Sequence, residues 1–331
     1  MRPSLKGRIL QTSVSIILAL ALLVFFFRQV AFRELVGLLR SLRFAPILGA
    51  VALALASYFA RAFRWGLILS PIGKAPFSTL LGCTFAGFAT SSVLPARLGE
   101  LVRPLLLSSR THLPAGATLA SIIAERLLDL ATVVSLAFLA LLWRAQAQQQ
   151  LVASFLWAAG GVLALGLFLI LVVRRRAAFA EFLARKAKNR LSQKLASLLQ
   201  EILNGLAFWG RPSHAALLGL WSLITWGLAI AQVAVTGPAF HHALSPRQAT
   251  LVLAISVVGL AVPTPGGVGG FHAAVQFALV QVVGWPKATA TAYALVHHAI
   301  CFVPVTLAGI GYMLAVGASW RALSRRPASE S

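Results

Sequence analysis

Hydrophobic residues run through this chain in long segments separated by short polar stretches. A helix needs about 20 mostly apolar residues, and at least about 17, to cross a bilayer. Six uninterrupted segments meet that length, at about 9–27, 44–60, 117–142, 152–173, 214–236 and 288–316. The pattern therefore predicts an all-α polytopic membrane protein with six transmembrane helices.

Two further apolar regions, 79–107 and 249–284, are broken near the middle by proline and glycine. The first contains the run Pro95-Ala96-Arg97-Leu98-Gly99, and the second contains Pro263-Thr264-Pro265-Gly266-Gly267-Val268-Gly269-Gly270. A helix made from half of the second region would cover about 21 Å of a hydrocarbon core that is roughly 30 Å thick. We expect both regions to form re-entrant helical hairpins, although full crossings by both halves would leave the rest of the chain on the same sides.

Basic residues orient the predicted spans. The segment 174–212 holds nine Lys or Arg against two Glu, and its leucines recur at helical spacing, which predicts a basic amphipathic helix that lies on anionic lipid or docks a partner. Cytoplasmic loops carry an excess of Lys and Arg. We therefore place this segment, the N-terminus and the basic tail 321–331 in the cytoplasm, an arrangement that two re-entrant hairpins satisfy. Segment 28–43, with four Arg and one Glu, falls outside and is the exception.

The predicted elements form two similar units inside one membrane domain, 1–320. Each unit has a span, a hairpin and a second span, and the two units enter from opposite faces, so the hairpins are opposed in an inverted repeat. Inverted repeats with broken helices are common in secondary transporters. Irregular backbone at membrane depth must be covered by protein or water. We therefore expect a cavity at the hairpin tips.

Composition agrees with a membrane protein and argues against several other classes. The chain is 59% hydrophobic and 11% charged, whereas soluble domains carry roughly 25% charged residues. The net charge of +22 fits loops at an anionic leaflet of the cytoplasmic (inner) membrane better than nucleic-acid binding. Cys83 and Cys301 lie in apolar segments and predict neither a disulfide nor a metal site. We expect no cofactor and no catalytic residue.

Charged residues in apolar surroundings are the first candidate site, since such groups are costly and usually functional. The chain has only seven acidic residues, and three of them share this part of the sequence with arginines. The candidates are Arg97, Glu100, Arg103, Glu125, Arg126 and Asp129. Their spacings of three and four place them on common helix faces. They could form an ion-pair network that locks the first hairpin to the following span, or a chamber whose guanidinium groups hold an anionic headgroup; both can hold at once.

Three motifs in these regions resemble those of a known family. They are Ser92-Val93-Leu94-Pro95-Ala96-Arg97-Leu98-Gly99-Glu100-Leu101-Val102-Arg103, Glu125-Arg126-Leu127-Leu128-Asp129 and Pro265-Gly266-Gly267-Val268-Gly269. Together with Arg61-Ala62-Phe63-Arg64-Trp65, they make the chain similar to the lysylphosphatidylglycerol synthase transmembrane (flippase-like) family. The resemblance implies a multi-span domain that moves lipids between leaflets. Because no aminoacyl-transferase domain follows Ser331, we do not expect the synthase reaction.

Two positions depart from the family pattern. His272 stands where members usually have a glutamate, and His298, six residues before Pro304, stands where they commonly have an arginine. The pair could be neutral imidazoles that share hydrogen bonds, a proton-responsive gate, or a metal site together with His297.

Glycines in the second hairpin are the remaining candidates. Gly266, Gly267 and Gly269 either permit a tight re-entrant turn or present bare amides to a phosphate. We expect a flippase-like protein that translocates or handles an anionic phospho- or polyprenyl-linked lipid. The alternatives are a non-catalytic accessory of an envelope lipid- or glycan-modifying enzyme, and a membrane-embedded lipid transferase. Membrane lipids are the expected partners, with a homo-oligomer or an envelope-biosynthesis enzyme as further possibilities.

Overall fold

The computed structural model describes residues 32–93, 99–142, 212–262 and 264–317, together with positions 160, 161, 175 and 193. The predicted spans 9–27 and 152–173, nearly all of the basic segment 174–212, the tail 321–331 and Arg97 lie outside this description, apart from the isolated positions. Every regular element in the described ranges is helical. The chain is an all-helical multi-pass membrane protein.

The described helices follow one another along the chain as two sets. The elements are α2 (Phe32–Arg40), α3 (Phe44–Leu69), α4 (Phe77–Val93), α5 (Gly99–Arg110), α6 (Ala115–Leu142), α10 (Pro212–Thr236), the 3-10 turn η3 (Gly237–Phe240), α11 (Pro246–Gly259), the turn η4 (Pro265–Gly267), α12 (Gly270–Phe277), the π-helical turn η5 (Ala278–Val283) and α13 (Lys287–Ala315). Helical segments Phe44–Leu69, Ser213–Phe240 and Lys287–Ala315 are long and apolar enough to cross a membrane. Helix α6 has 28 residues but carries three ionised side chains.

Helix α3 is longer than the sequence predicts. The apolar segment ends at residue 60 because Arg61 and Arg64 follow, yet the helix continues to Leu69. Both arginines pair with Asp129 inside the protein, so they do not mark a helix end at the membrane surface. A charge that finds a buried partner is compatible with a continuing helix.

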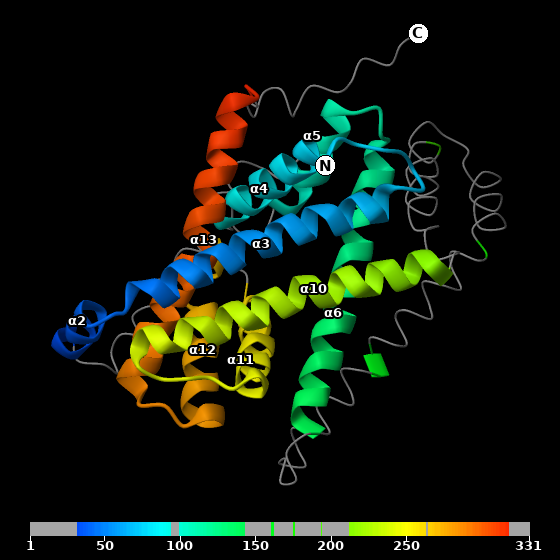
Figure 1. Ribbon diagram of the computed structural model, residues 1–331. Helices are drawn as coiled ribbons and strands as arrows, with labels where there is room; N and C mark the ends of the chain where they lie inside the picture. The colour runs from blue at the N-terminus through cyan, green and yellow to red at the C-terminus, as the bar shows by residue number, and fades with distance from the viewer. Residues whose placement is uncertain are drawn as a thin grey trace.

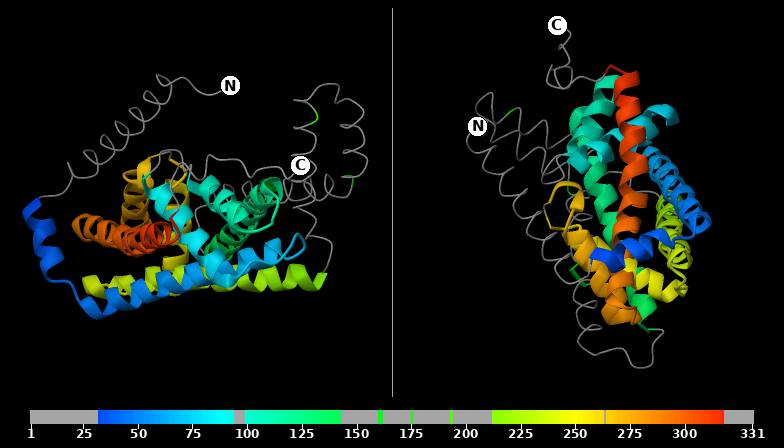
Figure 2. Two further views of the ribbon diagram at one scale, coloured as in Figure 1. Left: turned by 90° about the horizontal axis from the view of Figure 1, so that it is seen from above. Right: turned by 90° about the vertical axis from the view of Figure 1, so that its left-hand side faces the viewer.

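Helix packing repeats in the two halves of the described chain. Helices α3 and α10 lie side by side and antiparallel (Figures 1 and 2). Helix α4 packs against α5, and α11 packs against α12, so each interrupted region is a helical hairpin. The hairpin helix α4 also rests on α13 of the second half, and α11 rests on α6 of the first half. The hydropathy symmetry of the sequence therefore has a counterpart in the packing.

The two hairpins meet near their tips. Glycines in η4 make this approach possible, since Gly266 and Gly267 have φ of 59° and 68°, values that few other residues adopt. A Cβ atom at Gly266 would lie 3.2 Å from the carbonyl oxygen of Ser92, near the end of α4. Thr306 on α13 donates a hydrogen bond to the Ser92 hydroxyl at 3.1 Å. The end of α4, just before the first predicted interruption, therefore lies against the second interruption.

A glycine sets the distance between α4 and α13. A Cβ atom at Gly309 would collide with the carbonyl oxygen of Phe85 and come within 2.5 Å of the Ala89 Cβ. We expect Gly309→Ala to lower the free energy of unfolding by about 1–3 kcal/mol through overpacking. Gly311→Ala is the matched control, because nothing lies within 4 Å of a Cβ atom there. Thermal unfolding in detergent measures both, and equal midpoints would contradict the prediction.

Candidate functional site

Asp129, the only aspartate of the chain, is the centre of a charge network between α3, α6 and α10. Its Oδ1 accepts a hydrogen bond from Arg64 Nη2 at 2.6 Å and another from the indole Nε1 of Trp226 at 3.0 Å. Its Oδ2 lies 3.4 Å from Arg61 Nη1 and 3.2 Å from Arg126 Nη2. Both carboxylate oxygens therefore have cationic partners, as a buried charge requires.

Glu125, one turn earlier on α6, extends the network to the first hairpin. Its Oε2 accepts a hydrogen bond from Arg103 Nη1 at 2.7 Å, and its Oε1 lies 3.2 Å from Arg126 Nη2 and 3.7 Å from Arg64 Nη2. The Arg103 guanidinium also lies over the ring of Trp65, 3.9 Å from its centroid, which is a favourable cation–π arrangement. The ion pairs thus lock α5 to α6 and α3, as one of the sequence interpretations predicts.

Arginines outnumber carboxylates in the described network. It contains Arg61, Arg64, Arg103 and Arg126 against Glu100, Glu125 and Asp129. The side chains of Arg64 and Glu125 are fully buried, whereas that of Arg126 is 37% exposed and lies 3.9 Å from Glu100. The network therefore has a buried interior and a partly exposed edge.

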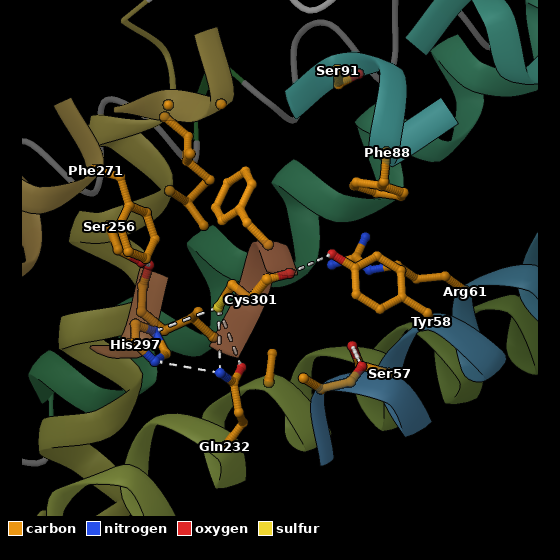
Figure 3. Close-up of a pocket in the computed structure, with 18 of the residues that line it drawn as sticks. Ser57, Tyr58, Arg61, Phe88, Ser91, Gln232, Ser256, Phe271, His297 and Cys301 are labelled. Atoms are coloured by element: carbon orange, nitrogen blue, oxygen red, sulfur yellow. Dashed lines mark hydrogen bonds between the residues drawn. The ribbon is translucent and has the colours of Figure 1, made fainter. Parts of the chain in front are cut away.

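This edge lines a cavity of about 200 Å³ (Figure 3). Helices α3, α6, α10 and α13 and residues of both hairpins form its walls. Arg61, Arg126 and Glu100 line one side, and Arg126 Nε has no hydrogen-bond partner among the described residues. A cavity near the hairpin tips is what the sequence predicts.

Uncharged polar groups line the other side of the cavity. Gln232 Nε2 lies 3.4 Å from His297 Nδ1 and 3.3 Å from Cys301 Sγ. Tyr58 on α3 donates a hydrogen bond from its hydroxyl to the Cys301 carbonyl oxygen at 3.4 Å. Figure 3 shows Gln232, His297 and Cys301 together and Arg61 across the cavity from them. Sequence analysis missed Gln232, although a lone glutamine in an apolar span is itself a signal.

The two histidines that depart from the family pattern lie together beside the second hairpin. The ring centroids of His272 and His298 are 4.5 Å apart. His298 Nε2 lies 2.9 Å from the carbonyl oxygen of Gly266, and the amide of Gly269 donates to His272 Nδ1 at 3.3 Å. These contacts agree with two hydrogen-bonded imidazoles. The gate stays a prediction, and within the described ranges no three His, Cys, Asp or Glu side chains gather closely enough to hold a metal ion.

The structure brings most predicted site residues into these two groups. Glu100, Arg103, Glu125, Arg126 and Asp129 meet in the charge network, while the predicted glycines and histidines meet at the second hairpin. Arg97 lies outside the described residues. Arg61 and Arg64, three residues apart on one face of α3, complete the network but enter the sequence analysis only through the resemblance.

Comparison with known proteins connects this site to a family. The family described as "Lysylphosphatidylglycerol synthase TM region" matches residues 12–309, which include both hairpins and the whole charge network. The chain belongs to this family. This family member is also 26% identical, over 92% of its own length, to a protein of Haloferax volcanii named "Glycosyltransferase AglD". It spans about half of that relative, 53% of its length.

Buried and cavity-facing arginines of this family member should differ in their contribution to stability. Arg64→Gln removes the shortest ion pair of Asp129 and the hydrogen bond to Ser222, so we expect a loss of about 3 kcal/mol in the free energy of unfolding. Arg126→Gln removes a partly exposed partner, and we expect a loss of about 1 kcal/mol or less. Thermal unfolding in detergent compares them, and a larger effect at position 126 would refute the division into interior and edge.

The hydrogen bond from His298 to the hairpin tip gives a second prediction. His298→Phe keeps an aromatic ring against Phe302 but releases the Gly266 carbonyl. We expect amide hydrogen exchange across residues 264–273 to rise several-fold. His214→Phe is the matched control, because it removes a comparable contact to the Leu67 carbonyl on α3. Unchanged exchange in the His298 variant would show that this contact does not hold the tip.

Proposed function

We propose that this protein translocates a lipid with an anionic headgroup between the leaflets of the membrane. The observation that carries the proposal is the cavity between the two hairpins with arginines on one wall. Among the described residues of the network, four arginines face three carboxylates, so an anionic group would balance the charge. The family match, whose description names the membrane region of a lipid synthase, supports a lipid as cargo.

Two arginines are placed to meet that headgroup. Arg61 and Arg126 line the cavity, whereas Arg64 and Arg103 are engaged with carboxylates behind them. Guanidinium groups bind phosphate oxygens through paired hydrogen bonds, and Arg126 Nε, 3.9 Å from Glu100 Oε2, makes no hydrogen bond among the described residues. In this proposal Glu125 and Asp129 orient the arginines, and Glu100 limits the net positive charge at the edge.

The proposal includes the arrangement of the chain in the bilayer. Helices α4, α5 and α11 have 17, 12 and 14 residues, which give lengths of about 26, 18 and 21 Å, less than the roughly 30 Å hydrocarbon core. We propose that both hairpins enter and return on the same side, one from each face, and that six further spans surround them. Both termini would then lie in the cytoplasm, with the protein in the cytoplasmic (inner) membrane.

A second candidate function follows from the relative's name. Because "Glycosyltransferase AglD" is about twice as long as the matched region, a membrane unit of this kind could present a lipid to a sugar-transfer reaction without moving it. The same cavity would hold the lipid, but no lipid would change leaflets. Co-purification with an envelope glycosyltransferase, in the absence of any translocation, would favour this function.

Translocation can be measured with the purified protein in liposomes. Fluorescent phosphatidylglycerol that starts in both leaflets becomes fully accessible to an external quencher if the protein moves it. We expect full accessibility with the wild-type protein and a rate at least about tenfold lower with Arg126→Gln, the effect of losing a charged hydrogen bond to phosphate.

Arg33→Gln provides the matched control, since Arg33 on α2 is exposed and is not among the residues that line the cavity. It should translocate like the wild type. Folded wild-type protein that leaves the inner-leaflet lipid as protected as empty liposomes do would refute translocation. Equal rates for Arg126→Gln and wild type would refute the assigned headgroup contact.

A further inference from the structure

We propose that the cavity selects a headgroup of two parts, a phosphate followed by an uncharged group rich in hydroxyls, such as glycerol, inositol or a sugar. This inference rests on the proposed function and specifies its cargo. It depends on the contrast between the two walls of the cavity. One wall is cationic, whereas the other offers only uncharged hydrogen-bonding groups.

The cavity lining contains a buried hydroxyl that makes no hydrogen bond among the described residues. Thr264, from the second hairpin, is a lining residue that is only 3% exposed, and its Oγ1 has no such partner. The Ser91 residue of the first hairpin is only partly buried, but its hydroxyl is also buried and has no hydrogen bond among the described residues. Buried hydroxyls are nearly always paired. Two unpaired ones that flank a cavity are therefore explained by a ligand that supplies the missing partners.

The Gln232 side chain also has hydrogen-bonding capacity that the described residues do not fill. Its amide nitrogen is 3.4 Å from His297 Nδ1 and 3.3 Å from Cys301 Sγ, and its oxygen accepts from Cys301 at 3.8 Å. The contact to the imidazole nitrogen is long, and thiols are weak partners. An amide oxygen has two lone pairs, and the Cys301 thiol engages one of them, so Gln232 has an acceptor position left for a hydroxyl of a ligand.

The charges on the lining disfavour a headgroup that ends in an amine. Among the described lining residues Glu100 is the one carboxylate, and it lies on the arginine side, 3.9 Å from Arg126. An ammonium group beyond the phosphate would therefore face Gln232 and His297 without a counter-ion. Burying an unpaired charge is costly, whereas burying hydroxyls against amide and hydroxyl groups is not.

The size of the cavity fits a headgroup and not a whole lipid. Pockets that enclose drug-sized ligands have volumes of roughly 300–1,000 Å³, whereas this cavity has about 200 Å³. Acyl or polyprenyl chains would then stay in the bilayer while the polar part passes through the protein. Recognition is thus confined to the phosphate and the group next to it.

Competition in the liposome assay tests this selectivity. Translocation of fluorescent phosphatidylglycerol is measured while unlabelled phosphatidylinositol, phosphatidate or phosphatidylethanolamine is added to phosphatidylcholine vesicles. We expect phosphatidylinositol to compete best, phosphatidate, which lacks the hydroxyl group, less well, and phosphatidylethanolamine least. Direct binding of the same lipids, by mass spectrometry of the intact complexes, gives the order independently of transport.

Two variants assign the selectivity to the uncharged wall. Thr264→Val removes a hydroxyl that makes no hydrogen bond among the described residues, so stability should not fall. The preference for phosphatidylinositol over phosphatidate should drop about threefold to tenfold, the value of one or two hydrogen bonds. Thr250→Val is the control, because its hydroxyl donates an exposed hydrogen bond to the Pro246 carbonyl in the first turn of α11 and is not part of the cavity lining. Gln232→Glu places an acid on the wall and should shift the preference toward phosphatidylethanolamine.

The outcomes separate this inference from the proposed function. If all anionic lipids bind and move equally, with no change in Thr264→Val, the selectivity is wrong while translocation stands. If binding follows the expected order but nothing moves, translocation is wrong while the selectivity stands. Preferred binding of phosphatidylethanolamine by the wild-type protein would overturn the assignment of the uncharged wall.

Discussion

The rest of this structure depends on the pairing of both Asp129 carboxylate oxygens with arginine side chains. A carboxylate in the middle of a 28-residue apolar helix would be untenable without counter-ions. Arg61 and Arg64 provide them from α3, and Arg126 provides one from its own helix. The pairing fixes the position of α3 along α6. The hydrogen bond from the Trp226 indole to Asp129 also holds α10 against α6. The cavity has a defined cationic wall because these side chains have little freedom to move.

The same network explains how a buried charge cluster can serve two purposes. Its interior pairs are satisfied by one another, as in any buried salt bridge that supports a fold. At its edge, Arg126 is shared between Glu100, Glu125 and Asp129, and its Nε makes no hydrogen bond among the described residues. The ion pairs agree with the structural interpretation of these charged residues. Binding of a headgroup at the edge of the network stays a proposal.

Much of the architecture follows from the sequence because bilayer thickness restricts helix length so strongly. The apolar segments 214–236 and 288–316 correspond closely to α10 and α13, and the proline- and glycine-rich runs mark the hairpin turns. Partners of individual side chains do not follow in this way. Arg61 and Arg64 look like the end of a span until the position of Asp129 is known. Likewise, the adjacent His297 and His298 have different neighbours. His297 lies beside Gln232, whereas His298 contacts the Gly266 carbonyl. The rotation of α13 about its axis determines these neighbours, and the sequence alone does not give that rotation.

The crossed support of the hairpins has a mechanical consequence. Helix α4 packs against α13, and α11 packs against α6. A shift of either hairpin would therefore displace a helix in the other half of the described chain. Tightly packed interiors transmit such displacements instead of absorbing them. A tilt of the first hairpin would carry along the helix that bears His297, and a tilt of the second would carry along the helix that bears Asp129. Movement of either hairpin would therefore be coupled to the other half of the described chain through direct helix packing.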